Sequence, residues 1–381
     1  MSFEHVVPDM KLAEKRFEKV NRLMEENNLD ALMIPPGPQT TYVTDSIYAM
    51  SIVIIPKGGG LDDASIVLNR LPGKEEYKYV NSQKLFSPWI RYVKSGLQHI
   101  PRIIKEFNRE KGTIGVVRLQ SQPLSFLDFL KRELPSGKFV DATDGYERLR
   151  MIKDSEEISR LMKGAEIADL TLIKLRSLVK PGVDEYDVLA EAGKFARLNG
   201  TDVGSLMIGA NPVFYFASSP YPGILRSPIK GKTLTKGETN MVELCSSHRS
   251  YWTRIGRTIN LGGSSDDERK TLDAVSQARN VALEAMAPGV QLSTIAKSIY
   301  ETLNREKLSE HIRHGLGGGI GLEIQEIPPI SIEERTKLKE NMVLNLRIGV
   351  YKPNHGGAFV ADNLLITNKG ARLLSKTPII L

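Results

Sequence analysis

Residues Arg313–Pro328 read RHGLGGGIGLEIQEIP, a glycine-rich run on which the interpretation of the C-terminal part of the chain depends. So many glycines suggest a phosphate-binding loop. The run lacks the G-x-G-x-x-G spacing, however, and contains no Gly-Lys-Ser/Thr. We therefore expect no nucleotide cradle here, and the role of the run has to be inferred from the segments around it.

The segments around the glycine run alternate between strand-like and helix-like patterns. Helices are expected after Leu149–Asp154, after the Pro181–Gly182 turn and over Asp266–Met286, where apolar residues recur at helical spacing. The strand-rich stretches are Ser205–Ile208, Met241–Leu244, Tyr251–Leu261, Met342–Gly349 and Asp362–Thr367. This order predicts an α+β domain with mostly antiparallel strands.

The N-terminal half has a different organisation, in which helices and strands alternate. A helix is expected from Met10 to about Asn28, with later ones over Ile100–Asn108 and Leu124–Leu134. The expected strands are Leu29–Pro35, Ser51–Pro56, Ala64–Leu68 and Thr113–Val117. Such alternation predicts an α/β domain. We therefore expect two domains, 1–145 and 150–381.

Composition narrows the class of protein. The 381 residues include 52 Lys+Arg and 45 Asp+Glu, a net charge of +7, with 41% hydrophobic and 25% charged residues. These values are ordinary for a globular protein and exclude a disordered or collagen-like chain. Cys245 is the single cysteine, so no intrachain disulfide and no cysteine-based zinc cluster can form. Without a basic block, an apolar span or a signal core, we expect a cytoplasmic protein with no nucleic-acid or membrane partner.

Five C-terminal segments together resemble the creatinase / prolidase / aminopeptidase P family, whose catalytic domain has the pita-bread fold. They are GANP at Gly209–Pro212, LTKGETNMVEL at Leu234–Leu244, YWTRIGRTINLG at Tyr251–Gly262, the glycine run, and NMVLNLRIGVY at Asn341–Tyr351. Their order and spacing make the resemblance specific, and it covers essentially the whole chain. It implies an α/β accessory domain followed by an α+β pita-bread domain, and a homodimer, as in many members of the family.

The resemblance also implies a site for two divalent metals, which the family's peptidases hold with two Asp, one His and two Glu. Laid on this chain, the five ligand positions fall on Glu243, Arg254, Gly318, Arg347 and Ala361. Only Glu243 can ligate a metal, and each arginine brings positive charge to the place of the ions. We therefore expect no bound metal and no other cofactor.

A shifted alignment would not restore the ligands. Asp362 adjoins Ala361, but a slip of one residue on a strand turns the side chain to the opposite face. No histidine lies within three residues of Gly318, and no carboxylate lies within six of Arg254. His314 is four residues before Gly318, where the family often has a second histidine that contacts the substrate.

The metal-free branch of the family is not matched either. Creatinase relies on a histidine five residues after the asparagine of a G-x-N segment, and that count leads from Asn211 to Phe216. Phenylalanine cannot act as a general base. The other proton-shuttling histidine of the peptidases falls on Gln325, which does not exchange protons near neutral pH. Phe216 is expected to fill space that substrate or a histidine occupies elsewhere.

Charge gives the cleft a positive expectation. In the peptidases four carboxylates offset two dications, 4 − 4 = 0, whereas Glu243 with Arg254 and Arg347 gives −1 + 2 = +1. The arginines could pair with Glu243 as a structural unit, or bind a ligand. Because an unpaired guanidinium in a partly dry cleft is costly, we expect a small anion contacted by Arg347 or Arg254, with His314 close by.

The leading hypothesis is a relative of the Xaa-Pro dipeptidases without the dinuclear metal site, which binds a small anionic molecule or a peptide in the old cleft. The candidate ligand-binding residues are Phe216, Glu243, Arg254, His314, Gln325 and Arg347. One alternative is a metal-independent hydrolase of C–N bonds, similar to creatinase, with Glu243 or His314 as its base. Another is a protein-interaction module.

Overall fold

The computed structural model describes residues 10–45, 51–68, 91–93, 96–202, 213–218, 233–312, 314–352 and 356–379. The expected strand Ser205–Ile208 therefore lies outside the described residues. The chain divides into two compact units, the first holding Met1–Arg150 and the second beginning at Met151. None of the described helices is both long enough and apolar enough to cross a membrane.

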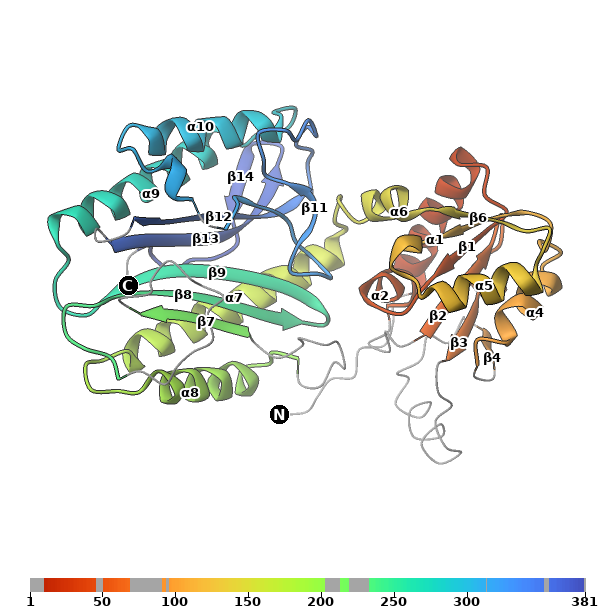
Figure 1. Ribbon diagram of the computed structural model, residues 1–381, viewed down its shortest axis with the longest axis horizontal. Coiled ribbons are helices and arrows are strands. Elements are labelled where there is room, and N and C mark those ends of the chain that lie inside the picture. Colours follow the sequence, from red (N-terminus) through yellow and green to blue (C-terminus); the bar gives the residue numbers. More distant parts are fainter. Residues whose placement is uncertain are drawn as a thin grey trace. The chain divides into compact units, whose positions relative to one another are not determined.

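The N-terminal unit is built on a sheet in which the described strands lie in the order β4-β3-β2-β1-β5-β6 (Figure 1). β1 is parallel to β5, β5 to β6 and β3 to β4, whereas β2 is antiparallel to both of its neighbours. The strands are β1 (Ala31–Ile34), β2 (Ser51–Pro56), β3 (Ser65–Leu68), β4 (Arg91–Val93), β5 (Thr113–Val116) and β6 (Lys138–Asp141). This is the α/β organisation that the sequence predicts.

Helices of the N-terminal unit agree with the apolar periodicity where the pattern is strong. They are α1 (Met10–Glu26), α2 (Pro38–Thr44), α4 (His99–Glu106), α5 (Leu124–Glu133) and α6 (Thr143–Leu149). α4 and α5 contribute Ile100, Ile103 and Leu130 to the same apolar cluster as the sheet residues Met33 and Ile54. The sequence PQTTYVT of α2 has no apolar periodicity, so the pattern missed this helix, which begins with proline at its first position.

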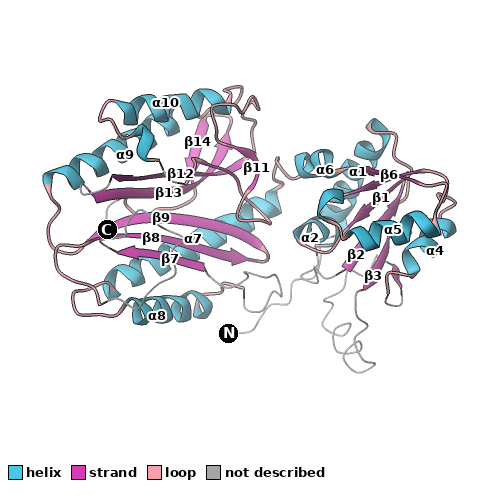
Figure 2. Cartoon of the chain, viewed as in Figure 1, coloured by secondary structure: helices cyan, strands magenta, loops and turns pink. Residues whose placement is uncertain are grey.

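The C-terminal unit has a larger, mostly antiparallel sheet in the order β11-β10-β12-β13-β9-β8-β7, with β14 paired to β13 (Figure 2). The strands are β7 (Val213–Ser218), β8 (Thr239–His248), β9 (Tyr251–Asn260), β10 (Gly317–Gly319), β11 (Glu326–Pro329), β12 (Val343–Lys352), β13 (Gly356–Thr367) and β14 (Gly370–Leu373). The helices are α7 (Ser155–Leu178), α8 (Glu185–Leu198), α9 (Asp266–Ala285) and α10 (Leu292–Asn304).

Capping explains where the two long helices begin. Asp154 and Glu157 form a capping box, so α7 begins at Ser155 and not within the Leu149–Asp154 stretch. Ser265 and Glu268 do the same for α9, whose start agrees with the expectation. α10 was not expected, although its residues Leu292, Ile295, Ile299 and Leu303 follow helical spacing and are buried.

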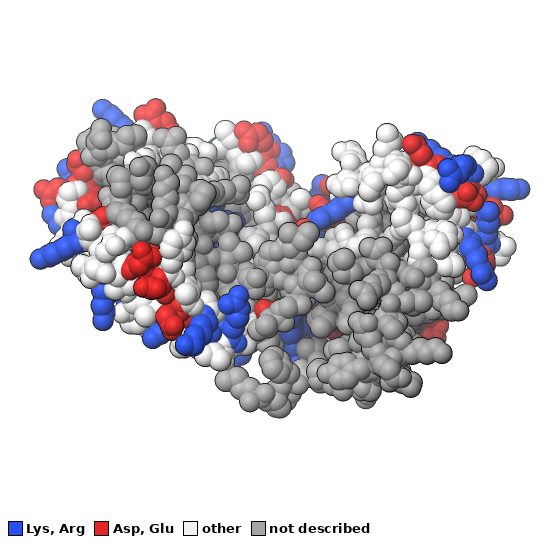
Figure 3. Space-filling view, turned by 60° about the horizontal axis from the view of Figure 1, so that its bottom comes forward, with Lys and Arg blue, Asp and Glu red and all other residues white. Residues whose placement is uncertain are grey.

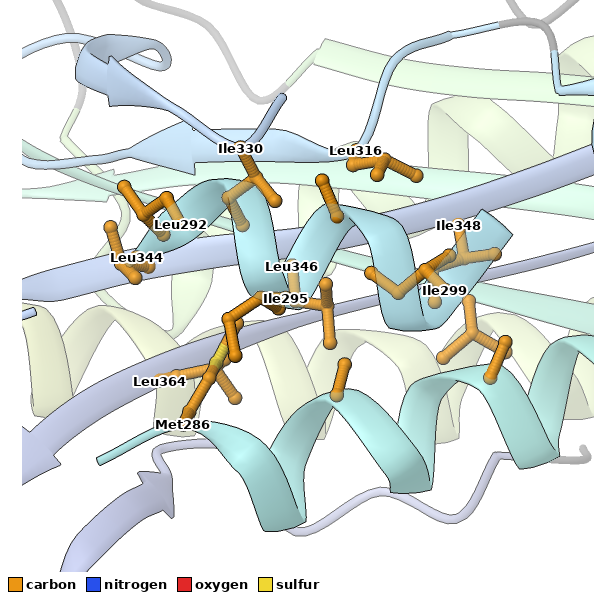
Figure 4. Close-up of a cluster of buried hydrophobic side chains, with 14 of the residues drawn as sticks. Met286, Leu292, Ile295, Ile299, Leu316, Ile330, Leu344, Leu346, Ile348 and Leu364 are labelled. Carbon is orange, nitrogen blue, oxygen red and sulfur yellow. The ribbon is translucent and has the colours of Figure 1, made fainter. Parts of the chain in front are cut away.

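Helices cover one face of this sheet, and this fixes which strand residues point the other way. Val242 and Leu244 of β8 and Ile255 of β9 pack in one apolar cluster with residues of α7 and α8. Leu346 and Ile348 of β12 pack with α9 and α10, as Figure 4 shows. Because strand side chains alternate, Glu243, Arg254, Arg347 and Ala361 lie on the opposite face, which we call the inner face.

The two halves of the sheet meet at β9 and β13. Within the described residues their ladder is confined to one pair, Ala361 opposite Gly256. Side chains add further links across this junction. The Thr258 hydroxyl donates to Phe359 O at 3.0 Å, and the Phe359 backbone N–H donates to Thr258 Oγ1 at 2.8 Å. Asn345 Nδ2 of β12 donates to Arg254 O at 2.7 Å. Polar side chains thus hold together two strand groups that share little backbone pairing.

Charge on the exterior is mixed. On the face that Figure 3 displays, acidic and basic side chains of the described residues are interspersed, and neither sign gathers into a single field. The net charge of +7 is therefore not concentrated on the part of the surface seen there.

Candidate functional site

Three charged side chains from three strands meet on the inner face. Glu243 of β8 accepts hydrogen bonds from Arg254 of β9, with Nε–Oε1 2.6 Å and Nη2–Oε2 3.0 Å. It also accepts from Arg347 of β12, with Nε–Oε1 2.5 Å and Nη2–Oε2 2.7 Å. Each carboxylate oxygen therefore receives two charge-assisted bonds, in the bidentate geometry that suits guanidinium and carboxylate. We call these three residues the Glu243 cluster.

Strand register explains how the guanidinium groups reach the carboxylate. Glu243 lies opposite Gly256, Gly256 opposite Ala361, and Ala361 opposite Arg347. The two positions between Glu243 and Arg347 thus carry no side chain beyond a methyl group, and the side chain of Arg347 extends past Ala361 to reach Glu243. Arg254 enters from the neighbouring row, where it lies opposite Cys245.

The cluster is buried and held by its surroundings. Glu243 is 0%, Arg347 3% and Arg254 8% exposed. Arg347 Nη1 donates to His314 O at 3.0 Å, so every nitrogen of this guanidinium has a protein acceptor. Its central carbon also lies 5.2 Å from the centre of the Phe359 ring, within the range of a cation–π contact. Arg347 is therefore held on every side of its guanidinium.

Phe359 fills the inner face beside the cluster. A Cβ placed on Gly256 would lie 2.0 Å from Phe359 Cε1, and one on Gly349 would lie 2.9 Å from Phe359 Cδ2. The ring is fully buried and packs with Met241 and Ala361. The two glycines thus make room for an aromatic ring, and this part of the inner face holds protein side chains rather than open space.

The protonation of Glu243 follows from its partners. Burial acts to raise the pKa of this carboxyl, but the hydrogen bonds and charges of Arg347 and Arg254 outweigh burial and lower the pKa below 4.5. Glu243 is therefore ionised throughout the neutral range and is a poor proton acceptor there.

This shift predicts how the cluster contributes to stability as the pH changes. A carboxyl whose pKa is lowered by folding stabilises the native state fully above its ordinary pKa, 4.5, and loses that contribution as the pH falls through the lower folded value. We expect the difference in unfolding free energy between wild type and Glu243→Gln to stay constant from about pH 7 to pH 5 and to shrink below the ordinary glutamate pKa. Urea titrations across this range measure it, and a difference that grows on acidification would contradict the assignment.

Family models match most of the chain. Metallopeptidase family M24 matches residues 159–368, and the creatinase/prolidase N-terminal domain matches residues 16–152. The chain belongs to metallopeptidase family M24. The family and the fold predicted from the five C-terminal segments are thereby confirmed.

Similar proteins include two archaeal Xaa-Pro dipeptidases. The Xaa-Pro dipeptidase of Pyrococcus furiosus is 28% identical over 370 residues, which cover 95% of this chain and 98% of that protein. The Xaa-Pro dipeptidase of Pyrococcus horikoshii is 25% identical over 374 residues, covering 97% and 99%. Among solved structures, the P. furiosus prolidase has a TM-score of 0.80 at 26% identity and covers 94% of this chain and 99% of that one. The Xaa-Pro dipeptidase of Bacillus anthracis has a TM-score of 0.84 at 22% identity, covering 97% and 100%, and shows the shared fold.

Asp362 does not face the Glu243 cluster, so shifting the alignment by one residue would not supply the carboxylate missing at Ala361. It lies on the face opposite the Glu243 cluster, where Asp362 Oδ1 accepts from Arg257 Nη2 and Oδ2 accepts from Arg279 Nε, both at 2.8 Å. The prediction that a neighbouring carboxylate would face away from the inner face is thus confirmed. Ala361, at the M24 ligand position itself, is buried and offers only a methyl group.

Gly318 lies directly against the backbone of the neighbouring strand. A Cβ at this position would lie 2.7 Å from Pro328 O and 2.9 Å from Pro329 Cα. Both atoms belong to the backbone of β11, which pairs with β10 across Gly318. The space beside Gly318 is therefore taken by the neighbouring strand.

The other predicted residues lie at different distances from the cluster. The His314 carbonyl binds Arg347, and its ring stands edge-on to Phe359 at 6.4 Å between centroids. Gln325 is exposed just before β11 and makes no contact with the cluster. Glu326 begins β11, and its Oε2 lies 2.7 Å from Lys153 Nζ. Phe216 lies in β7 opposite Val242, and its side chain is outside the described part of the chain.

The sequence did not predict the second arginine–carboxylate group, on the helix-covered face. Arg257 is fully buried and donates from all three of its nitrogens. Besides Asp362, the acceptors are the carbonyls of Gly256, Ala361, Thr377 and Pro378, at 2.6–2.8 Å. Most of these acceptors are backbone groups far from Arg257 in the sequence, and no residue pattern predicts them. The one available signal was Asp362 itself, the single charged residue of β13.

The five residues that the sequence resemblance assigns to the metal-ligand positions of M24 peptidases do not fit a pair of divalent metals. Carboxylate oxygen and imidazole nitrogen are the donors that such ions need. Here both oxygens of the one carboxylate are taken by guanidinium groups, and the other four positions supply two cations, a hydrogen and a methyl group. Across the described ranges, no three His, Cys, Asp or Glu side chains are grouped to hold a metal ion.

Proposed function

We propose that this chain is an M24 member that does not hydrolyse peptides, and that its former metal site is an internal ion cluster. The observation that carries the proposal is the double bidentate contact of Glu243 with Arg254 and Arg347. A two-metal hydrolase needs metals to lower the pKa of a bound water and to stabilise charge on the attacked group. A guanidinium holds its proton throughout the physiological range, so it supplies positive charge but no activated water.

A metal-independent hydrolase receives less support. Its proposed base, Glu243, is ionised but has both oxygens engaged by two cations, so removing a proton from water would break charge-assisted bonds. His314 is fixed near Phe359 and contributes its backbone carbonyl to Arg347. A general base must reach the proton that it abstracts. The contacts of Glu243 and His314 fit a structural role better than the role of a general base.

The ligand class follows from the side chains of the cluster. It holds two guanidinium groups, which form strong charge-assisted bonds to anions, and Arg347 has its nitrogens engaged by Glu243 and His314 O. Arg254 is the more exposed of the two arginines, 8% against 3%. We propose that a small carboxylate or phosphate binds at the Arg254 end of the cluster.

Peptidase assays test the first part of the proposal. We expect purified protein to leave Xaa-Pro dipeptides intact, with or without added Mn²⁺, Co²⁺ or Zn²⁺, and to retain less than one metal ion per chain after dialysis. The Xaa-Pro dipeptidase of P. furiosus serves as the positive control under the same conditions. Turnover that co-elutes with the protein and disappears in Glu243→Gln would refute the proposal.

Thermal unfolding with anions tests the second part. We expect citrate or phosphate to raise Tm more than chloride at equal ionic strength, because a ligand that binds only the native state stabilises it. Arg254→Lys should remove this difference, since lysine lacks the bidentate fork. Arg279→Lys, which alters the arginine group on the opposite face, is the matched control and should respond like wild type. Equal responses from the two variants would exclude an anion site at Arg254.

A further inference from the structure

The N-terminal unit contains a cavity of about 180 Å³ that plays no part in the Glu243 cluster. Ile52 of β2, Val67 of β3 and Phe126 of α5 form its inner wall, and all three belong to the buried apolar cluster of this unit. Leu97, at 43% exposure, lies on its outer side. The lining is therefore chiefly apolar, and the cavity extends from the core of the unit towards the surface.

The cavity occupies a favourable place in the sheet. Pro36 follows β1, Val67 is the third residue of β3, and Gln122 follows β5. β1 and β5 are parallel. β2 is antiparallel to both β1 and β3, so β3 runs in the same direction as β1. These residues thus lie at the carboxyl ends of strands that share one direction.

The strand order gives that edge further weight. From β1 the chain proceeds outward through β2, β3 and β4, and then returns to β5 on the other side of β1. In open α/β sheets, ligands bind outside the carboxyl ends of the strands where the order reverses. The cavity is lined by Ile52 and Val67 of the sheet and by Phe126 of α5.

Size and lining indicate what the cavity can hold. An apolar cavity of about 150 Å³ lined by Leu, Ile and Phe is known to bind benzene or xenon. The present cavity is somewhat larger, opens to the surface beside Leu97, and is lined by Ile, Val, Leu and Phe together with two prolines and Gln122. A charged group would lose its hydration against these walls without a counter-charge, so the part of the ligand that enters must be neutral.

We propose that this cavity is a binding site for a small neutral molecule with a benzene-sized apolar group and one hydrogen-bond donor. Gln122 is the polar residue in its lining. Gln122 Nε2 donates to Arg118 O at 3.0 Å, and since a carbonyl only accepts, this bond fixes which end of the amide is nitrogen. The Oε1 atom is then the acceptor available for the donor of the ligand. The site is independent of the proposed function of the C-terminal unit.

Benzene and phenol are suitable probes for the full-length protein. We expect both to raise Tm in a saturable manner, and crystals exposed to either probe to show the ring between Val67 and Phe126. Leu97→Trp should fill the outer part of the cavity and abolish both effects. Leu198→Trp, at another exposed leucine in α8, is the control and should leave them unchanged. Failure of both probes to bind, or equal binding to the two tryptophan variants, would overturn the proposal.

A second variant tests the polar anchor separately. A neutral hydrogen bond is worth about 0.5–1.5 kcal/mol, so phenol should bind wild type roughly two- to tenfold more tightly than benzene. Gln122→Met has nearly the same shape but lacks the acceptor, and should equalise the two affinities while benzene binding persists. If phenol keeps its advantage in Gln122→Met, the assignment of Gln122 as the anchor is wrong.

Discussion

Glu243→Ala is expected to lower the free energy of unfolding by about 3–5 kcal/mol, the cost of leaving a buried charge without its partner. Arg254 and Arg347 would then face each other with no counter-charge, at 8% and 3% exposure. Water can only partly fill the space left by the carboxylate. Hydration of the two arginines should therefore recover little of the lost unfolding free energy. Urea denaturation at neutral pH, analysed for both the midpoint and the slope, measures the effect.

Two comparisons separate the effect of leaving buried arginines unpaired from the effect of removing any glutamate. Glu166→Ala removes a glutamate whose partner, Lys163, is well exposed, and it should cost no more than about 1 kcal/mol. Replacing all three residues of the Glu243 cluster by apolar residues of similar volume should recover most of the stability, as it does for other buried ion groups. A Glu243→Ala protein within 1 kcal/mol of wild type would mean that the cluster contributes little to the fold.

Gly318→Ala is expected to lower the free energy of unfolding by about 1–3 kcal/mol through overpacking. The new Cβ would lie 2.7 Å from Pro328 O and 2.9 Å from Pro329 Cα, and neither backbone atom can rotate away as a side chain could. The β10–β11 pairing would have to open to admit the methyl group. Differential scanning calorimetry of the variant and the wild type measures the loss.

Gly60→Ala is the matched control, because its Cβ would meet only Asp63 Oδ2, at 3.9 Å. This substitution should be neutral, or stabilising by about 0.4–1 kcal/mol through the unfolded chain. Gly318→His extends the test to function, since it restores the histidine of the M24 pattern. We expect it to be at least as unstable as Gly318→Ala and to bind no Mn²⁺. Equal stabilities of the two alanine variants would show that β11 yields easily.

The fold was predictable where a single physical rule governs a segment. Apolar alternation identified the strands around Glu243 and Arg347, because one face of each packs against helices. Helical periodicity identified α1, α4, α5 and α7. α2 escaped because its buried residues are mostly polar and are satisfied by local hydrogen bonds, such as Thr44 Oγ1 to Thr40 O at 2.8 Å. Such local bonding leaves no periodic signal.

The candidate site was predictable in composition but not in geometry. Motif spacing placed Glu243, Arg254 and Arg347 near one another. It left open whether the two arginines pair with Glu243 or bind a ligand. The choice depends on Gly256 and Ala361, whose small side chains let Arg347 reach across two strands. It also depends on Phe359, which fills the adjoining space. These are relations between strands, and a linear pattern does not contain them.

If the Glu243 cluster takes the place of bound metals, as we propose, the fold should be independent of metal supply. In a protein that gains stability from a bound ion, the native population rises and falls with the free concentration of that ion, by mass action. Here both positive groups are part of the chain and are made in fixed proportion to the carboxylate that they neutralise. Chelators should not lower the Tm of this protein, and metal starvation of the cell should not change its lifetime.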